Sequence, residues 1–300
     1  MSTDTDADPE TTSAATSRQG DGARTGGGID LKRVSLYAVV AVMAAFYLAP
    51  LWTGLVTAFK TQDAFFGTTP LAPALPGTEG FTVRPWLEAW AALLPGIVNS
   101  LWFTVPAAVL SALLGSLAAY GLTNVDWRGQ VALLVPFVAG VFIPYQSVLV
   151  PLTQFWNWFP LPVGGLAELA ITHVAYGVPI CTVLFRGYYL TLDEEMLEAA
   201  RLDGASIYRI YLRIVLPLSK PMFAVALIYQ FTNIWNDLLF ALVLAPPNAP
   251  PVTIALNQFK GSMVNQYNLQ MAGAFIAALP TLIIYVLFGE QFARGVAGET

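Results

Sequence analysis

Few side chains in this 300-residue sequence could do chemistry, since it contains a single histidine, His173, and a single cysteine, Cys181. The chain can therefore form neither a paired-histidine nor a cysteine-based zinc site. It also lacks the GxxxxGK[ST] loop that cradles nucleotide phosphates. We therefore expect no catalytic residue, no metal site and no cofactor held by this chain itself.

The polar segment 187–220 has a defined pattern of helix signals. Thr191 and Glu194 have the spacing of a capping box, and a helical stripe follows through Met196, Ala199 and Leu202. Gly204 can end this helix by adopting a positive φ, and a second short helix is expected over 205–215. This pair of helices fits either a docking element for another protein or an amphipathic helix on a membrane surface.

These polar residues belong to a chain whose composition excludes a free-standing soluble enzyme. Hydrophobic residues make up 56% and charged residues 11%, against about a quarter charged in soluble proteins. Residues 1–30 carry six acids against two bases and almost no large apolar side chain, which predicts a disordered tail. The chain offers no basic surface for nucleic acid.

Six long apolar runs predict an all-α integral membrane protein. Between Arg33 and Lys60, for example, lie only uncharged residues, enough to cross a bilayer of about 30 Å at about 1.5 Å per residue. The six expected spans are 34–59, 97–122, 131–153, 169–185, 222–244 and 269–288. Together they form one domain over 31–300.

The basic residues predict the orientation of these spans. Eleven of them fall on the side of the N-terminus and three on the other side, and cytoplasmic loops carry the excess. The eleven are Arg18, Arg24, Lys32, Arg33, Arg128, Arg186, Arg201, Arg209, Arg213, Lys220 and Arg294. We therefore expect both termini and segment 187–220 to be cytoplasmic, in a multi-pass protein of the cell membrane.

Segment 187–220 resembles the EAA loop of the integral-membrane subunits of binding-protein-dependent ABC importers. That pattern is EAA, three residues, Gly, nine residues, then Ile-x-Leu-Pro. The matching positions are Glu198, Ala199, Ala200, Gly204, Ile214, Leu216 and Pro217. The WND at 235–237 and the ending EQFARGVAG are similar to carbohydrate permeases of the maltose type. IPYQSVLVPL, HVAYGVPICTVLFRGYY and FTNIWNDLLF look like the branch that imports glucose or related monosaccharides.

The resemblance implies the type I importer (MetI-like) fold and a set of partners. These are a second homologous permease, two ATP-binding subunits that hold ATP and Mg, an extracellular sugar-binding protein, and membrane lipid. It also implies that the loop seats in a groove of the ATPase. The coupling residues would be Glu198, Ala199, Ala200, Arg201, Asp203 and Gly204. The chain stops soon after the glycines that match the family's longer tail, so we expect no tail contact with the ATPases.

Polar side chains in span 222–244 suggest the substrate path. Asp237 is the only carboxylate in the predicted spans, and such residues are costly in a membrane. Amides bond to sugar hydroxyls and an aromatic face suits a sugar ring, so we expect a path lined by Tyr229, Asn233, Trp235, Asn236 and Asp237. Alternatively, Asp237 is hydrated near the outer interface, or residues 235–237 pack against the partner permease.

Other transport functions remain as alternatives. The imported solute could be a disaccharide or a glycerol-phosphate-type compound rather than glucose. An ion-coupled secondary transporter would also have six spans and a buried carboxylate, but it would not explain the EAA spacing.

Overall fold

The computed structural model describes residues 31–125, 127–162, 164–259 and 266–297, so the predicted tail 1–30 lies outside it. The chain divides into two compact units, Met1–Leu48 and Ala49–Thr300. In the first unit the structure describes the beginning of one helix, α1 (Leu31–Ala58), whose apolar side chains from Val34 to Leu48 are exposed. Exposed apolar residues on all sides of a helix are typical of a helix that is surrounded by lipid or by other helices.

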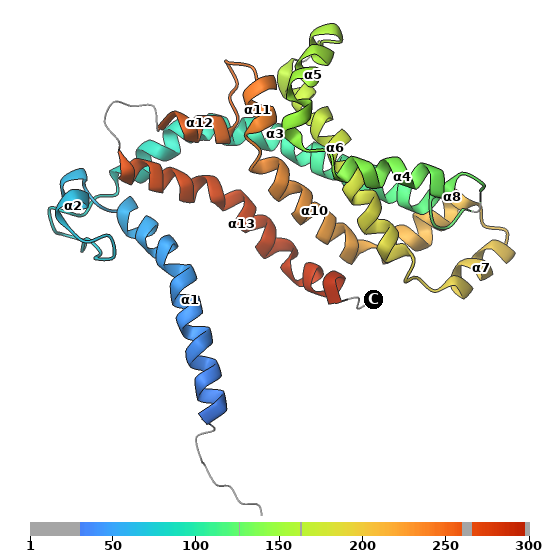
Figure 1. The fold of residues 1–300 in the computed structure, drawn as a ribbon, viewed down its shortest axis with the longest axis horizontal. Coiled ribbons are helices and arrows are strands. Elements are labelled where there is room, and N and C mark those ends of the chain that lie inside the picture. Colours follow the sequence, from blue (N-terminus) through green and yellow to red (C-terminus); the bar gives the residue numbers. More distant parts are fainter. Residues whose placement is uncertain (1–30, 126, 163, 260–265, 298–300) are drawn as a thin grey trace, which may run out of the picture. The chain divides into compact units, whose positions relative to one another are not determined.

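In the described residues of the second unit the regular secondary structure is helical, joined by loops and accompanied by one isolated bridge between Lys60 and Phe81 (Figure 1). Its long helices are α3 (Arg84–Gly121), α6 (Gly165–Tyr189), α10 (Lys220–Trp235) and α13 (Tyr267–Ala297). The shorter elements are α2 (Gln62–Gly67), α4 (Gln130–Val141), α5 (Tyr145–Trp158), α7 (Glu194–Leu202), α8 (Ile207–Ile210), the π-helical turn η1 (Tyr211–Val215), α9 (Leu216–Leu218), α11 (Leu239–Leu244) and α12 (Val252–Gln258).

Four of the described helices are long and apolar enough to cross a membrane, and two bent pairs raise the number to six if each pair is one span. The pairs are Gln130–Val141 with Tyr145–Trp158, bent by 101°, and Ile207–Leu218 with Lys220–Trp235, bent by 74°. The first bend coincides with Pro144, whose ring fixes φ and removes a backbone donor. This bend lies within the span expected over 131–153, where three prolines suggest kinks.

The span expected over 222–244 is also interrupted. Helix α10 ends at Trp235, and α11 begins only at Leu239. The intervening Asn236 and Asp237 bond to nearby backbone groups, which offers the chain an alternative to continuing the helix. Helix α3 differs in another way, since it begins at Arg84 rather than near residue 97, with Pro85 in its first turn.

Helices α3 and α6 pack closely along their lengths because small residues face each other. A Cβ on Gly115 would lie 2.9 Å from the carbonyl carbon of Cys181, and one on Gly177 would lie 2.7 Å from Cβ of Ser111. Neither site can hold a larger side chain without moving backbone or core atoms. Helix α10 joins this pair through Gln230, whose Nε2 donates to the Gly177 carbonyl at 2.9 Å.

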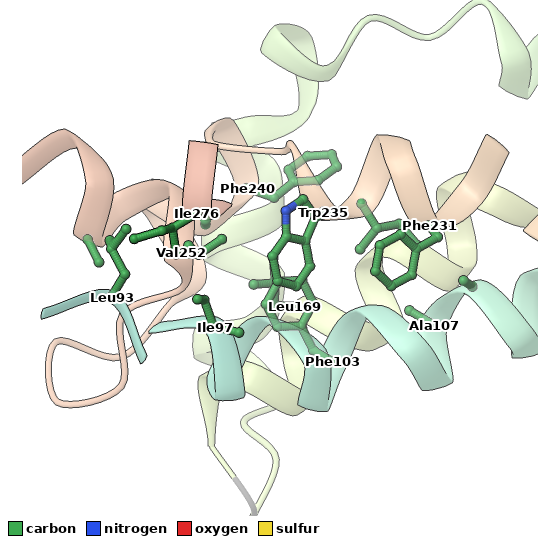
Figure 2. Packing of buried hydrophobic residues seen from close by; sticks show 14 of the residues in the cluster. Leu93, Ile97, Phe103, Ala107, Leu169, Phe231, Trp235, Phe240, Val252 and Ile276 are labelled. Atoms are coloured by element: carbon green, nitrogen blue, oxygen red, sulfur yellow. The ribbon is translucent and has the colours of Figure 1, made fainter. Parts of the chain in front are cut away.

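Two clusters of buried apolar residues lie along α3. The first joins the N-terminal half of α3 to α6, α10, α11, α12 and α13, with Phe103, Leu169 and Trp235 among its members (Figure 2). The second joins the C-terminal half of α3 to α6, α7, η1 and the start of α10. In Figure 1, α7 and α8 lie at the end of this unit opposite α2.

Candidate functional site

Helix α7 begins one turn after α6 ends, with an aspartate at its N-cap. The Asp193 side chain accepts a hydrogen bond from the Glu195 N–H at 2.9 Å. The expected capping box with Thr191 is therefore wrong. Thr191 instead donates from its hydroxyl to the Tyr188 carbonyl at 2.7 Å, at the end of α6. Asp193 has taken the cap because it lies directly before the first helical residue, where a short side chain reaches the free N–H groups.

Gly204 ends α7 as the sequence predicts, with φ at 76°. The Gly204 N–H donates to the Arg201 carbonyl at 3.0 Å, and the Ala205 N–H donates to the Ala200 carbonyl at 3.1 Å. These two bonds form a Schellman motif, which requires a left-handed residue at the glycine position. The second helix, expected over 205–215, begins at Ile207 after its N-cap Ser206, and α8 continues directly into the π-helical turn η1, which ends at Val215. We call residues 193–210 the elbow.

The elbow is fastened to the C-terminal end of α3. Leu197 is 3% exposed and joins the second apolar cluster. The Arg201 guanidinium donates to the Asn124 carbonyl at 2.8 Å, and the Tyr120 hydroxyl donates to the Ile207 carbonyl at 3.1 Å. Each half of the elbow is therefore tied to α3 or to the chain just after it.

Buried hydroxyl groups hold the segment after the elbow. The Ser116 hydroxyl is hydrogen-bonded to those of Tyr189, at 2.6 Å, and Tyr211, at 2.9 Å. The Tyr188 hydroxyl donates to the Leu218 carbonyl at 2.8 Å. Because buried polar groups are costly when left unpaired, this network favours one arrangement of α3, α6 and η1.

The opposite face of the elbow exposes apolar side chains. Leu202 is 89% exposed and Tyr208 is 69% exposed, with Ile207 between them in the sequence. Glu198, Ala199, Arg201, Asp203 and Gly204 are also exposed, whereas Ala200 is half-buried. The expected stripe through Ala199 and Leu202 is thus not the buried face, since Leu197 supplies the main contact with the core. The structure brings all six expected coupling residues together on this one element.

The residues expected to line the substrate path divide into two groups on and after α10. Tyr229, Asn233 and Asn236 are exposed and, at spacings of four and three residues, share one helical face. The Asn233 and Asn236 amides each donate to the carbonyl four residues earlier, at 2.8 Å. Trp235 and Asp237 do not lie on this face. Trp235 is 2% exposed and donates from Nε1 to the Ala277 carbonyl of α13 at 2.9 Å.

Asp237 lies in the break between α10 and α11. Its Oδ2 accepts hydrogen bonds from the N–H groups of Phe240, at 3.1 Å, and Ala241, at 3.3 Å. The same oxygen is 3.6 Å from Nε2 of His173 on α6. His173 is buried here, with 3% of its surface exposed. Within the described ranges, no group of three or more His, Cys, Asp or Glu side chains could hold a metal ion.

Comparison with known proteins identifies the family of this helical arrangement. A family described as binding-protein-dependent transport system inner membrane component matches residues 111–296. Over 292 residues the chain is 47% identical to the xylose/arabinose import permease protein XacI of Haloferax volcanii, covering 90% of this chain and 94% of that protein. It is 26% identical to the glucose import system permease protein GlcU of Saccharolobus solfataricus, covering 87% and 92%.

Among solved structures, the chain resembles a bacterial ABC transporter involved in the import of the acidic polysaccharide alginate. The TM-score is 0.67 at 17% sequence identity, over 87% of this chain and 96% of that one. This likeness confirms the all-α fold of an ABC importer transmembrane domain. Both the resemblance stated from the EAA spacing and the expectation of a transport component rather than an enzyme are confirmed. The chain is a membrane-spanning permease subunit of the ABC type and belongs to the family of binding-protein-dependent transport system inner membrane components.

Proposed function

We propose that this chain is a permease subunit of an ATP-driven sugar importer and that the elbow receives the motion of an ATPase. The observation that carries this proposal is the contrast between the two faces of the elbow. One face is fastened to α3 by Leu197, Arg201 and Tyr120, and the other exposes Leu202 and Tyr208. Exposed apolar residues gathered on a rigid element are typical of a protein–protein contact.

Coupling follows from the hydrogen bonds behind the elbow. ATP and Mg would be bound by two ATPase subunits, and their closure would push on the exposed face. Since the elbow is bonded to α3, and η1 is bonded to Ser116 of α3, a push moves the helices rather than a loop. The excess of basic residues favours a cytoplasmic position for the elbow and for both termini.

The sugar path would pass along the exposed face of α10. Tyr229 offers a hydroxyl and an aromatic face, while Asn233 and Asn236 offer amide groups that can both donate and accept. A second homologous permease would complete the path opposite this face. Trp235 and Asp237 would not contact the sugar. Both are buried against neighbouring helices, so they would hold in place the helices that form the walls of the path.

The substrate we propose is a monosaccharide delivered by an extracellular sugar-binding protein. The resemblance of three sequence segments to glucose-type permeases favours glucose or a related sugar. The relative that is 47% identical is named for xylose and arabinose. A pentose is therefore the first sugar to test, with glucose second. Uptake of a disaccharide or a glycerol phosphate in preference to both would contradict this part of the proposal.

The decisive experiment is reconstitution in proteoliposomes with the second permease, the ATPase subunits and the binding protein. We expect sugar uptake that requires ATP and the binding protein together. Labelled xylose, arabinose, glucose and maltose would be compared at equal concentration. Accumulation by this chain alone, driven by an ion gradient, would overturn the proposal in favour of a secondary transporter.

A further inference from the structure

Asp237 and His173 form a buried pair between α6 and the break that follows α10. Their side chains are 5% and 3% exposed, and Oδ2 of Asp237 lies 3.6 Å from Nε2 of His173. The imidazole lies between two rings, stacked on Phe103 at 5.9 Å and meeting Phe240 edge-on at 5.4 Å. A buried carboxylate in such surroundings needs a compensating positive charge or a set of hydrogen bonds.

The carboxylate holds the break between α10 and α11 in place. It accepts the N–H groups of Phe240 and Ala241, which would otherwise be unpaired at the start of α11. The Asp237 carbonyl also accepts the hydroxyl of Thr253 on α12 at 3.0 Å. One residue therefore joins the end of α10 to the next two helices, directly after Asn236.

His173 faces this carboxylate from α6. Of the described residues, it is the one that brings a potential cation within 4 Å of the Asp237 carboxylate. Its Nε2 is buried, has no hydrogen-bond partner among the described residues, and lies 3.6 Å from Oδ2. This distance is too long for a hydrogen bond, and the contact is an ion pair when the imidazole is protonated.

We propose that Asp237 and His173 are a positioning pair that fixes the break after α10 and thereby the direction of Asn233 and Asn236. Neither member touches the solute. The inference rests on the proposed function, because it assigns these two residues to the walls of the same sugar path. It explains why the predicted spans contain one carboxylate and why this carboxylate is not on the exposed face of α10.

The pair predicts an asymmetry between its two members. Replacing His173 with glutamine removes the imidazole that faces the buried carboxylate, and a buried carboxylate that loses its partner is costly. Replacing Asp237 with asparagine removes the carboxylate itself, and the amide oxygen can still accept from the N–H groups of Phe240 and Ala241. Loss of His173 should therefore be suppressed by Asp237→Asn.

The test uses the complete importer in proteoliposomes with five variants: His173→Gln, Asp237→Asn, the double variant, Asp237→Ala, and Asn257→Ala as a control. Asn257 is exposed, and its amide donates to the carbonyl four residues earlier on α12, so its replacement should leave transport unchanged. The readouts are the amount of assembled complex, sugar uptake, and sugar transported per ATP hydrolysed.

We expect His173→Gln to lower sugar transported per ATP by about tenfold or more, with ATP hydrolysis retained. Asp237→Asn and the double variant should remain within about threefold of wild type, since the cap persists without a buried charge. Asp237→Ala should be impaired whether or not His173 is present. If His173→Gln fails to assemble, recovery of assembly and uptake in the double variant supports the pair.

Three results would overturn the inference: wild-type transport in His173→Gln, a double variant no better than His173→Gln, or a proportional fall in uptake and ATP hydrolysis in assembled His173→Gln. Failure of the proposed function would show differently, because the wild-type complex itself would then import no sugar. In that case the recovery of assembly by Asp237→Asn in the His173→Gln background would still report whether the pair exists.

Discussion

Substitution of Gly204 is the most direct test of the elbow. A side chain at this position would strain the backbone, whose φ is 76°, without contacting a neighbouring residue. A Cβ at this position meets no atom within 4 Å, so a substitution acts on the backbone alone. A residue with a side chain in the left-handed region costs about 1–2 kcal/mol. Escaping the strain would break the two hydrogen bonds of the Schellman motif, at about 1 kcal/mol each.

Both routes therefore weaken the native elbow by about 1–2 kcal/mol, which is roughly a tenfold change in its population relative to other conformations. For Gly204→Val we expect sugar transported per ATP to fall by up to about tenfold in the reconstituted importer. Gly204→Asn should stay near wild type, since asparagine tolerates this region. The matched control is Gly187→Val, because Gly187 lies in helix α6 with no atom within 4 Å of its added Cβ and no positive φ. Equal transport in Gly204→Val and wild type, or equal loss in Gly204→Val and Gly204→Asn, would refute this reasoning.

Three further predictions concern the elbow surface, the helix core and Lys60, which follows α1. Leu202→Glu should reduce copurification of the ATPase subunits, whereas Leu71→Glu, at another exposed leucine, should not; equal retention would count against the docking face. Gly177→Ala should destabilise the purified protein by about 1–3 kcal/mol, because the new methyl group overlaps Ser111. The control is Gly121→Ala, whose methyl group meets no atom within 4 Å. Thermal unfolding in detergent compares the two variants, and equal unfolding midpoints would contradict the close packing of α3 and α6. Burial lowers the pKa of Lys60 from its usual 10.5, so the unfolded chain holds more protons between the two pKa values and the folded state gains stability as pH rises toward 10.5. Lys60→Met should remove this gain in thermal unfolding measured across that pH range, and an unchanged pH profile would show that Lys60 does not cause it.

The sequence predicts the parts of this fold that depend on local signals. Arg33 and Lys60 flank the apolar stretch of α1, and Gly204 marks the turn of the elbow. The spacing from Glu198 to Pro217 identifies the family before any coordinates are considered. In each case the feature depends on residues that are near one another in the sequence, where residue type and spacing act directly.

Other features depend on contacts between residues that are distant in the sequence, and the sequence predicts them only in part or not at all. The break after Trp235 follows from Asp237 bonding to the backbone of α11, in surroundings that only the folded helices create. The approach of His173 joins two spans through no local pattern. One signal could have found it, since a lone carboxylate and a lone histidine in otherwise uncharged spans invite pairing. The burial of Leu197 instead of Leu202 similarly depends on where α3 ends.

Helix α10 has a consequence for the scale of movement in the membrane. It runs unbroken over 16 residues between the 74° bend at one end and the Asp237 break at the other. Its length is about 24 Å, so a tilt of about 10° about the first end would carry the second end sideways by about 4 Å. That distance approaches the width of a sugar ring. A small rotation of α10 as a rigid helix is thus sufficient to widen or close a passage for a single solute, without any unwinding of the helix.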